Sequence, residues 1–269
     1  MEKKLIVLCN EKQYEVTRIK EEALKRNIRV CVTSTEAFTE DLLTGGSFLL
    51  IRSVTGALKE AKEIAKKAHA RGLAVFDRKF LTDKFYNKMT AYEKMKKAGF
   101  FLPRVIKLNN QTIHTIKKEF VSDYVVVKRF IGKRGKHIFR TKKDKLKEFY
   151  EKLPKGKYLA QEFIEIEKEL RVIIIRNKFF GAAEKKSGQW KKNLSREGSA
   201  KPTRISRKVK EACEKAAKLF DVDIAGIDVG LSKNKIFIIE VNRSPGFKQF
   251  EKGTKKNVAE EIVKSVLKN

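Results

Sequence analysis

Residues 236–246 read IFIIEVNRSPG, an apolar run that ends in Glu240 and, two positions later, Asn242. Because side chains alternate along a strand, these two lie on one face, and Asp228 lies across a short turn in the preceding apolar strand, residues 226–231. Two carboxylates buried together need cations, and an all-oxygen ligand set suits Mg²⁺. The stretch predicts a magnesium nucleotide site. The alternative is a surface hairpin whose carboxylates pair with lysines.

Composition indicates a well-packed protein of about two domains. The chain has 269 residues, 41% of them hydrophobic, and only four prolines. Cys9, Cys31 and Cys213 are too scattered for a disulfide framework or a metal cluster, so we expect reduced, buried cysteines. The amino-terminal apolar segment is too short for a signal peptide, and no apolar run reaches membrane-spanning length. We therefore expect a soluble cytoplasmic protein.

The net charge is unusually positive, with 63 Lys and Arg against 33 Asp and Glu, or +30. The first 87 residues carry 17 basic and 12 acidic side chains, so most of the excess lies in the rest of the chain. One interpretation is a set of solvated surface lysines. The other is a polyanionic partner, such as nucleic acid, an acidic peptide tail or a phosphorylated substrate.

The amino-terminal region alternates between strand and helix patterns, which predicts a small α/β layer with a parallel sheet. Its first strand-to-helix turn lacks glycine, so the dinucleotide-binding fingerprint is absent. Arg52 follows an apolar strand, where such folds bind ligands, although an exposed surface arginine is the competing interpretation. We expect strands at residues 5–9, 28–33, 48–51 and 73–76, and helices at residues 14–26 and 57–70.

A second unit begins after a boundary near residues 77–83, and Lys88 opens an amphipathic helix. Further on, a β-branched strand runs into Lys128 and then into a basic turn that contains Gly132, Lys133 and Gly135. The amides and lysines of such a loop can wrap polyphosphate oxygens. No helix follows, so it is not a P-loop, and a plain hairpin turn is the alternative. Lys128 at the end of a buried strand is the stronger signal.

A short strand at residues 158–164 breaks into an acidic stretch that contains Glu169 and is followed by Arg171. The exposed end of a strand can hydrogen-bond an adenine edge through its backbone, and a nearby carboxylate can accept the ribose hydroxyls. This segment is therefore a hinge-like candidate nucleotide seat. These residues alone also fit an ordinary connection between two strands.

The order of these features along nearly the whole chain resembles that of ATP-grasp ligases, and the residues of the motifs resemble those of the RimK-type branch. The lysine, the basic glycine loop, the hinge strand, the arginine and the acidic cluster follow one another as they do in that family. The closest motifs are Lys88 fifteen residues before Pro103, KRFIGKRGKHI (128–138), AQEFIE (160–165), LRVIII (170–175), NLSREG (193–198), AGIDV (225–229) and IEVNRSPGF (239–247).

The resemblance implies a fold and a set of site residues. It implies an α/β pre-ATP-grasp domain at residues 1–80 and an ATP-grasp domain at 81–269, whose two α+β subdomains (about 88–160 and 161–269) clamp ATP. It implies metal ligands for two Mg²⁺ ions, with Mn²⁺ as a substitute: Asp228, Glu240 and Asn242. It implies ATP contacts from Lys88, Lys128, Gly132, Lys133, Gly135, Gln161, Glu162, Phe163, Ile164 and Glu169. Residues expected to face the reacting groups are Arg171, Lys128, Asn193 and Arg196. Weaker substrate candidates are Arg52, Lys185, Arg243, Ser244 and Gly246.

The family's chemistry needs positioned cations and magnesium rather than a protein nucleophile. A substrate carboxylate attacks the γ-phosphate, and an amine captures the acylphosphate to form an amide. We expect glutamate as the amino acid and an acidic protein tail, a carrier or a small molecule as the acceptor. The alternatives are a ligase of the same fold that acts on RNA or a ribosomal component, and a non-catalytic basic nucleic-acid-binding protein with a retained ATP site. A homo-oligomer is compatible with the sequence.

The chain departs from the family pattern mainly on the substrate side. Residues 184–190 form a loop about two residues shorter than usual, and Glu197 stands where glycine is common. The high net charge is a further departure. Four lysines and an arginine are expected to flank the acceptor entrance, where they would attract an acidic tail or nucleic acid: Lys185, Lys186, Lys191, Lys192 and Arg196.

Overall fold

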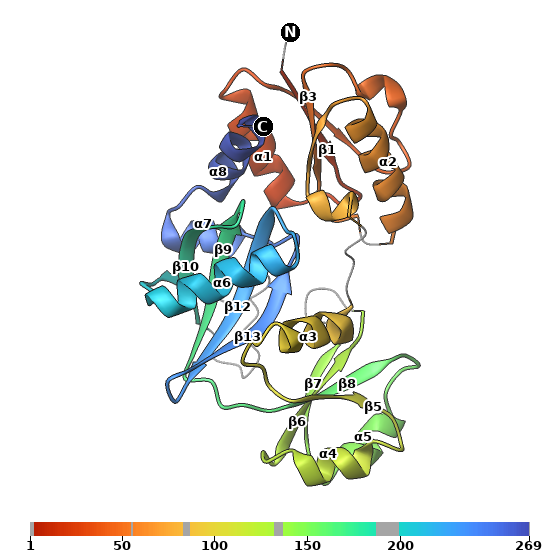
Figure 1. Ribbon diagram of the computed structural model, residues 1–269, viewed down its shortest axis with the longest axis vertical. Coiled ribbons are helices and arrows are strands. Elements are labelled where there is room, and N and C mark those ends of the chain that lie inside the picture. Colours follow the sequence, from red (N-terminus) through yellow and green to blue (C-terminus); the bar gives the residue numbers. More distant parts are fainter. Residues whose placement is uncertain (1–2, 55, 83–86, 132–136, 187–198, 269) are drawn as a thin grey trace.

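The computed structural model describes residues 3–54, 56–82, 87–131, 137–186 and 199–268. Figure 1 shows an amino-terminal sheet at the top, a five-stranded sheet in the middle and a four-stranded sheet at the bottom. The last two helices, α7 (Lys248–Thr254) and α8 (Val258–Leu267), return the chain to the top, where α8 lies beside α1 (Tyr14–Leu24). The α/β fold class expected from the sequence is confirmed.

The amino-terminal sheet is entirely parallel and has the order β2-β1-β3-β4, as the alternating strand and helix pattern predicted. The side chains of alternate residues in β1 point to opposite faces of the sheet. Ile6 packs toward α2, whereas Leu5 and Val7 pack toward α1 and α8. The elements are β1 (Lys4–Leu8), α1, β2 (Arg29–Thr33), the 3₁₀ turn η1 (Glu40–Leu42), β3 (Ser47–Ile51), α2 (Leu58–Ala70), β4 (Ala74–Phe76) and the 3₁₀ turn η2 (Arg78–Phe80).

The four-stranded sheet is antiparallel, with the order β5-β8-β6-β7. Val125 and Val127 of β6 face the helices α4 and α5 in one apolar cluster. Lys128 follows Val127 and therefore points to the opposite face, toward the five-stranded sheet. The elements are α3 (Lys88–Lys97), β5 (Val105–Leu108), α4 (Ile113–Glu119), β6 (Tyr124–Arg129), β7 (Ile138–Lys142), α5 (Leu146–Glu151) and β8 (Tyr158–Glu162).

The five-stranded sheet has the order β11-β10-β9-β12-β13 and is covered on one face by α6. Part of its other face packs against α7 and α8 in the same apolar cluster that includes α1. Its elements are β9 (Lys168–Ile175), β10 (Lys178–Lys186), β11 (Ser199–Pro202), α6 (Arg207–Leu219), β12 (Ile224–Ser232) and β13 (Lys235–Asn242). The division of the chain at residue 80, and of the second part near residue 160, remains a proposal.

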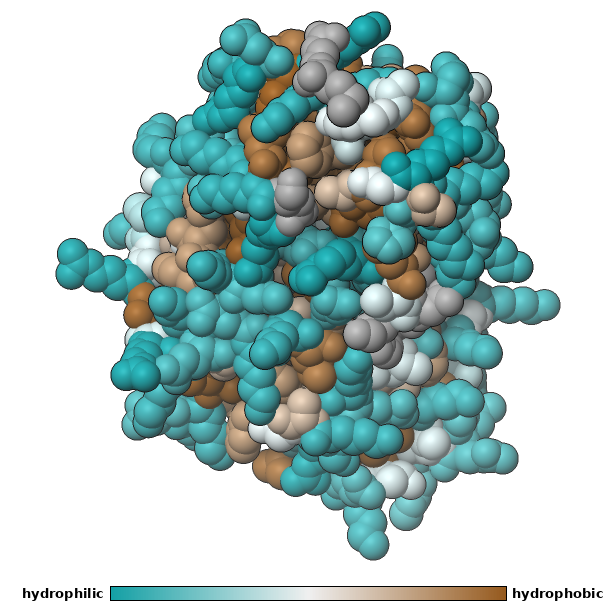
Figure 2. All heavy atoms as spheres, turned by 45° about the horizontal axis from the view of Figure 1, so that its top comes forward, coloured by the Kyte–Doolittle hydropathy of each residue, from teal (hydrophilic) through white to brown (hydrophobic). Residues whose placement is uncertain are grey.

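The surface reflects the charged composition. Figure 2 shows that hydrophilic side chains cover most of the face it presents. Cys9 and Cys213 are buried as expected, whereas Cys31 is only half-buried because β2 is an edge strand. Among the described residues, no helix is long and apolar enough to cross a lipid bilayer.

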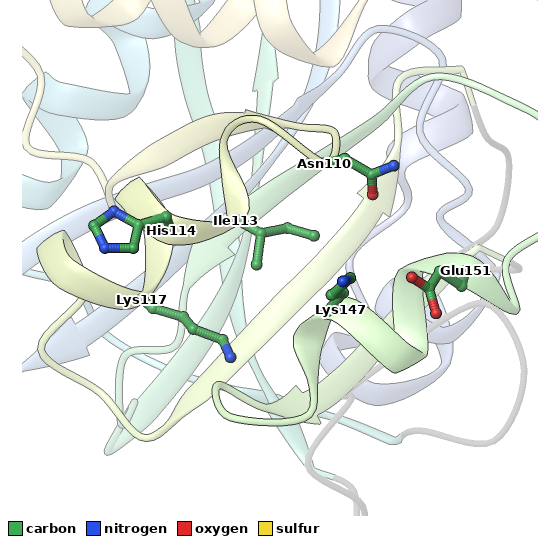
Figure 3. Close-up of a pocket in the computed structure, with 6 residues that line it drawn as sticks. All are labelled: Asn110, Ile113, His114, Lys117, Lys147 and Glu151. Atoms are coloured by element: carbon green, nitrogen blue, oxygen red, sulfur yellow. The ribbon is translucent and has the colours of Figure 1, made fainter.

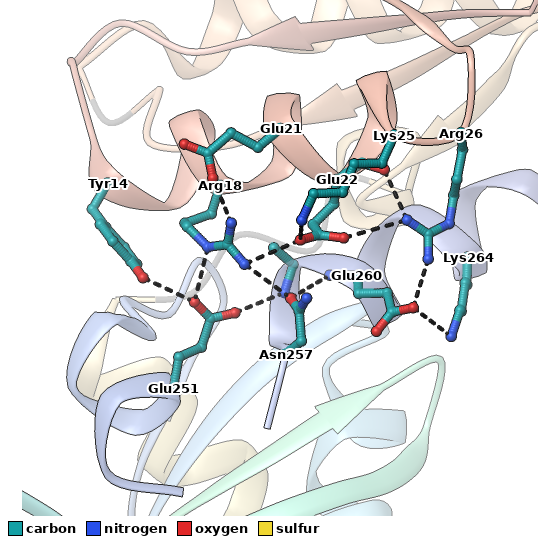
Figure 4. Close-up of polar contacts among 11 residues, drawn as sticks. Tyr14, Arg18, Glu21, Glu22, Lys25, Arg26, Glu251, Asn257, Glu260 and Lys264 are labelled. Carbon is teal, nitrogen blue, oxygen red and sulfur yellow. Dashed lines mark hydrogen bonds and ion pairs between the residues drawn. The ribbon is translucent and has the colours of Figure 1, made fainter. Parts of the chain in front are cut away.

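A network of charges joins α1 to α7 and α8 (Figure 4). The Glu22 side chain is 3% exposed and accepts hydrogen bonds from Arg18 at 3.2 Å and Lys25 at 2.9 Å. Glu251 accepts a hydrogen bond from the Tyr14 hydroxyl at 3.1 Å. These buried carboxylates have several donors each, and they fasten the start of the chain to its end.

Acid is expected to weaken this connection through Glu22. Burial opposes ionisation of this carboxylate, but hydrogen bonds from Lys25, Asn257 and Arg18 prevail and lower its pKa from 4.5 to about 2. Because the folded-state pKa is the lower one, the stabilisation is complete above about pH 4.5 and is lost as the pH falls toward 2. Urea unfolding from about pH 6 to pH 3 should show a shallower loss of stability for Glu22→Gln than for the wild type. Equal pH slopes would contradict this assignment.

Candidate active site

Charged side chains meet at the centre of one face of the five-stranded sheet. Leu170 and Val172 of β9 belong to the apolar cluster under α6, so Arg171 between them points to the opposite face. Arg171 is directly opposite Asp228 of β12, and Asp228 is directly opposite Glu240 of β13. Because directly opposite residues share a face, these three side chains converge.

A tight turn and a bulge bring Asp228 and Glu240 onto the same face. Lys233 and Asn234 both have positive φ, which is typical of a two-residue hairpin turn and fixes the register near the turn. That register alone would set Asp228 opposite Ile239. A register shift between Asp228 and Val229 makes Ile239 the extra residue of a β-bulge, so that Glu240 takes the position opposite Asp228.

Asp228 lies between two cations. It is 6% exposed, and its carboxylate accepts hydrogen bonds from Arg171 Nε at 2.7 Å and Nη2 at 3.3 Å. Lys185 Nζ lies 2.9 Å from the same carboxylate and donates a hydrogen bond to Glu169 at 2.6 Å. Lys185 is 3% exposed, whereas Lys186 is exposed, and the expected place of both residues beside the acceptor entrance remains a prediction.

Glu240 pairs with Lys88, the first residue of α3. The Asn87 side chain caps this helix by accepting hydrogen bonds from Met89 N and Thr90 N. This cap fixes the start of the helix at Lys88. Burial opposes ionisation of Glu240, but the attraction of Lys88, Lys128 and Arg171 prevails and lowers its pKa to about 2. Glu240 is therefore a carboxylate at every physiological pH.

Lys128 reaches this cluster from the four-stranded sheet. Its ammonium donates a hydrogen bond to the Gln161 side chain of β8 at 2.7 Å. Burial and the nearby Lys88, opposed by the attraction of Glu240 and Asp228, together lower its pKa to about 8. A backbone hydrogen bond of 3.3 Å from Lys88 N to Phe130 O ties α3 to the start of the glycine loop. Cations from two sheets and a helix thus surround two carboxylates.

These residues fit a magnesium nucleotide. Asp228 and Glu240 offer carboxylate oxygens on one face, and Asn242 follows on the same face of β13. Four cations now neutralise the carboxylates. When a metal binds the carboxylate oxygens, these cations would pair with phosphate oxygens instead: Lys88, Lys128, Arg171 and Lys185. Among the described residues, no group of three or more His, Cys, Asp or Glu side chains could hold a metal ion. Beyond the two carboxylates, a metal would therefore take its remaining ligands from the Asn242 amide and from phosphate or water.

The predicted adenine seat lies at the end of β8. Gln161 accepts from Lys128, and the Glu162 carboxylate accepts a hydrogen bond from Val121 N at 2.8 Å. Phe163 packs edge-on against Tyr124, with ring centroids 6.0 Å apart, and Ile164 is half-buried. Glu169 is bonded to Lys185 and stands apart from these four residues in sequence. The proposed nucleotide contacts of all five remain predictions.

The segment after Asn242 lies against β12 and the amino-terminal domain. An ideal Cβ at Gly226 would lie 2.6 Å from Pro245 Cβ and 2.8 Å from Arg171 Nη1, so only glycine leaves room for both. On the other side, Arg52 Nη2 donates a hydrogen bond to Pro245 O at 2.8 Å. Arg52 is 2% exposed, so its interpretation as a surface arginine is wrong.

Replacing Gly226 with alanine is expected to displace the segment that follows Asn242. The added methyl group would overlap Pro245 and Arg171, and such overpacking costs about 1–3 kcal/mol. Thermal unfolding should show this loss for Gly226→Ala. Gly156→Ala is the matched control, because its added Cβ would meet only the flexible Arg129 side chain at 3.0 Å. Equal stability of the two variants would show that the close contact is not limiting.

Several predicted residues lie outside the described part of the chain, and their roles remain predictions. Those of the glycine loop are Gly132, Lys133 and Gly135, and those of the NLSREG motif are Asn193 and Arg196. Of the other substrate candidates, Arg243 and Ser244 are half-buried and Gly246 is exposed.

Lys79 and Glu15 contact the same segment and were not predicted from the sequence. Lys79 is 5% exposed and donates a hydrogen bond to Arg243 O at 3.1 Å. Glu15 is 8% exposed and accepts a hydrogen bond from Phe247 N at 2.9 Å. Lys79 lies in the short turn that follows β4 of the parallel sheet, and this position was the one available signal.

A hollow of about 470 Å³ lies away from the charged cluster, between α4 and α5 (Figure 3). It is lined by Asn110, Ile113, His114, Lys117, Lys147 and Glu151. The lining carries charges of both signs and includes none of the predicted site residues. We assign it no role.

A lysine-bearing antiparallel sheet that faces a carboxylate-bearing sheet, next to a parallel amino-terminal domain, defines the ATP-grasp class of ligase. Residues 83–266 match the model of the RimK-like ATP-grasp domain. The chain belongs to this family. It is therefore an ATP-dependent ligase of the carboxylate-amine type, and ATP and Mg²⁺ binding are typical of the family.

Curated relatives and solved structures agree with this assignment. The chain is 27% identical to a "probable alpha-L-glutamate ligase" of Vibrio vulnificus (strain YJ016) over 214 residues, which are 77% of this chain and 71% of that protein. A protein of the same description from Vibrio atlanticus (strain LGP32) is 34% identical over 119 residues, 43% of this chain and 40% of the relative. The ATP-grasp ligase PsnB, solved with a phosphomimetic variant of its minimal precursor, Mg and ADP, superposes with a TM-score of 0.78 over 100% of this chain and 99% of that one. At 17% identity, this last likeness shows the fold alone.

Proposed function

We propose that the protein uses ATP to join glutamate to an acidic acceptor through an acylphosphate. The observation that carries the proposal is the meeting of Asp228 and Glu240 with cations from both sheets, since this arrangement suits a polyphosphate and its metal. The choice of glutamate rests on the curated relatives described as probable alpha-L-glutamate ligases.

In the proposed reaction, a carboxylate oxygen attacks the γ-phosphorus of ATP, the bond to the β,γ-bridging oxygen breaks, and ADP leaves. The amine of the second substrate then attacks the acyl carbon, inorganic phosphate leaves, and the amine nitrogen loses a proton. Lys88 and Lys128 would hold phosphate oxygens, and Arg171 would face the transferred group. Two magnesium ions held by Asp228, Glu240 and Asn242 would neutralise the phosphate charge when bound.

The charge near the site supports an acidic acceptor. Lys168, Lys186, Lys201 and Arg204 lie around the paired strands β10 and β11, and we call these four residues the basic rim. Glu184 is the acidic residue among them and pairs with Lys168 at 3.5 Å. The basic rim borders Lys185 in the sequence, but strand alternation places Lys168, Lys186 and Lys201 on the α6 face of the sheet, opposite to Lys185 and Asp228. The rim would therefore attract an acidic chain to this end of the sheet without contacting the reacting groups.

The nature of the acceptor can be tested by ADP release with ATP, Mg²⁺ and glutamate in the presence of host extract. We expect release that needs both glutamate and the extract and that disappears after protease treatment of the extract. Loss after ribonuclease treatment would instead support an RNA acceptor, which the +30 net charge also favours. The proposal would be contradicted if ADP release by the wild type did not rise when glutamate was added and stayed at the level measured for Glu240→Gln.

A further inference from the structure

The segment 243–247, which directly follows the proposed metal ligand Asn242, is held through its main chain by the amino-terminal domain. Arg52 donates to Pro245 O at 2.8 Å, and Lys79 donates to Arg243 O at 3.1 Å. Glu15 accepts from Phe247 N at 2.9 Å. All three side chains come from the carboxyl-terminal edge of the parallel sheet: Arg52 follows β3, Lys79 follows β4, and Glu15 is in the first turn of α1.

These three charged side chains are deeply buried, with exposures of 2%, 5% and 8% for Arg52, Lys79 and Glu15. Buried charges are costly unless they are paired and hydrogen-bonded. Lys79 pairs with Asp77, whereas its main long-range contact is a carbonyl oxygen of the segment. Burial, followed by repulsion from Arg243 and Arg52, sets the pKa of Lys79 well below its usual range. Because burying charged side chains is costly, attachment of one domain to the other does not by itself explain them.

Other contacts already join the two parts of the chain. The α1–α8 network does so at one side, and Arg78 does so at another, with Nε 3.0 Å from Asp223 Oδ1. Neither touches the main chain of segment 243–247. The donors directed at its carbonyl oxygens therefore do something that domain attachment does not require.

The opposite side of the segment rests on the site itself. Pro245 lies over Gly226, so closely that a Cβ at Gly226 would overlap both Pro245 and Arg171. Arg171 in turn holds Asp228. A shift of Pro245 would therefore be felt by Arg171 and by Asn242, three residues earlier in the chain.

We propose that Arg52 and Lys79 are positioning residues, which hold segment 243–247 against Gly226 and thereby keep Arg171 and Asn242 in place for the reaction. The amino-terminal domain thus completes the ligase site through hydrogen bonds to two carbonyl oxygens of this segment. The Ser244 hydroxyl and Arg52 Nε are buried without a hydrogen-bond partner in the described part of the chain. The effect on turnover rests on the proposed function.

The test compares Arg52→Met, Arg52→Lys and Arg78→Met. Hydrogen exchange of the peptide that contains residues 243–248 should accelerate in Arg52→Met, return toward wild type in Arg52→Lys, which keeps a donor for Pro245 O, and stay unchanged in Arg78→Met. Misplacing reacting groups by about 1 Å can cost about 10²-fold, so we expect kcat for ADP release to fall about that much in Arg52→Met. The calorimetric Kd for ADP without Mg²⁺, which does not depend on the metal ligand Asn242, should change by less than about threefold.

Unchanged exchange of residues 243–248 in Arg52→Met would overturn the proposal, and so would equal effects of Arg52→Met and Arg78→Met on exchange and on unfolding temperature. The exchange comparison needs no substrate. If the wild type released no ADP, the proposed function would fail while exchange still decided whether Arg52 positions the segment.

Discussion

Glu240→Gln is expected to lower magnesium-dependent ADP release by about 10²- to 10³-fold while leaving the protein folded. Glutamine keeps the size of the side chain but removes the charge that balances Lys88 and Lys128 and that would bind the metal. Because the pKa of Glu240 is about 2, the wild-type side chain is ionised throughout the working pH range. Glutamine cannot ionise, so raising the pH should not rescue the loss. Initial rates at saturating Mg²⁺ measure the effect.

Glu22→Gln is the matched control for this variant. It also removes a carboxylate paired with basic side chains, but one that lies between α1 and α8 and is not among the residues of the site. We expect it to lower the unfolding temperature and to leave the rate of ADP release nearly unchanged. Activity of Glu240→Gln within a few-fold of wild type would rule out Glu240 as a metal ligand.

Lys128→Met is expected to weaken MgATP binding by about 10- to 100-fold, the loss of one charge-assisted hydrogen bond to phosphate. The pKa of Lys128 in the free protein is about 8, because burial and then Lys88 oppose the charge that Glu240 favours. A phosphate nearby favours the ammonium form. Wild-type affinity should therefore fall as the pH rises through about 8, and binding above that pH should take up a proton.

Calorimetry in two buffers of different ionisation enthalpy measures this proton uptake directly. We expect uptake at about pH 9 for the wild type, much less at about pH 7, and none attributable to this site in Lys128→Met. The Gln161 side chain would lose its partner in the variant, so Gln161→Ala serves as the control for that contact. Wild-type affinity that stays constant from about pH 7 to 9 would contradict the role of Lys128.

The sequence predicted the elements well where the signal was local. The parallel amino-terminal sheet followed from strand and helix patterns, and the hairpin between Asp228 and Glu240 followed from a short turn. Alternation correctly placed Glu240 and Asn242 on one face. The expected convergence of Asp228 with these two residues also holds, but it depends on the bulge at Ile239, which shifts the register of the hairpin and has no clear sequence signature.

The partners of the site residues could not be predicted, because they are distant in the sequence. Lys88 and Glu240 are 152 positions apart, and Arg52 and Pro245 are 193 apart. A charged residue beside an apolar strand is expected to be exposed unless its partner is known, so the burial of Arg52 and Lys185 could not be predicted. Their burial results from tertiary packing rather than from local propensity.

Incorporation of radiolabelled glutamate into host macromolecules, measured together with ADP release in the presence of ATP and Mg²⁺, tests the ligase proposal most directly. For the wild type we predict one ADP per glutamate incorporated, with neither product above background in Glu240→Gln. ADP release without glutamate incorporation, or incorporation that persists without ATP, would contradict the proposed glutamate ligase reaction at Asp228, Glu240 and the surrounding cations.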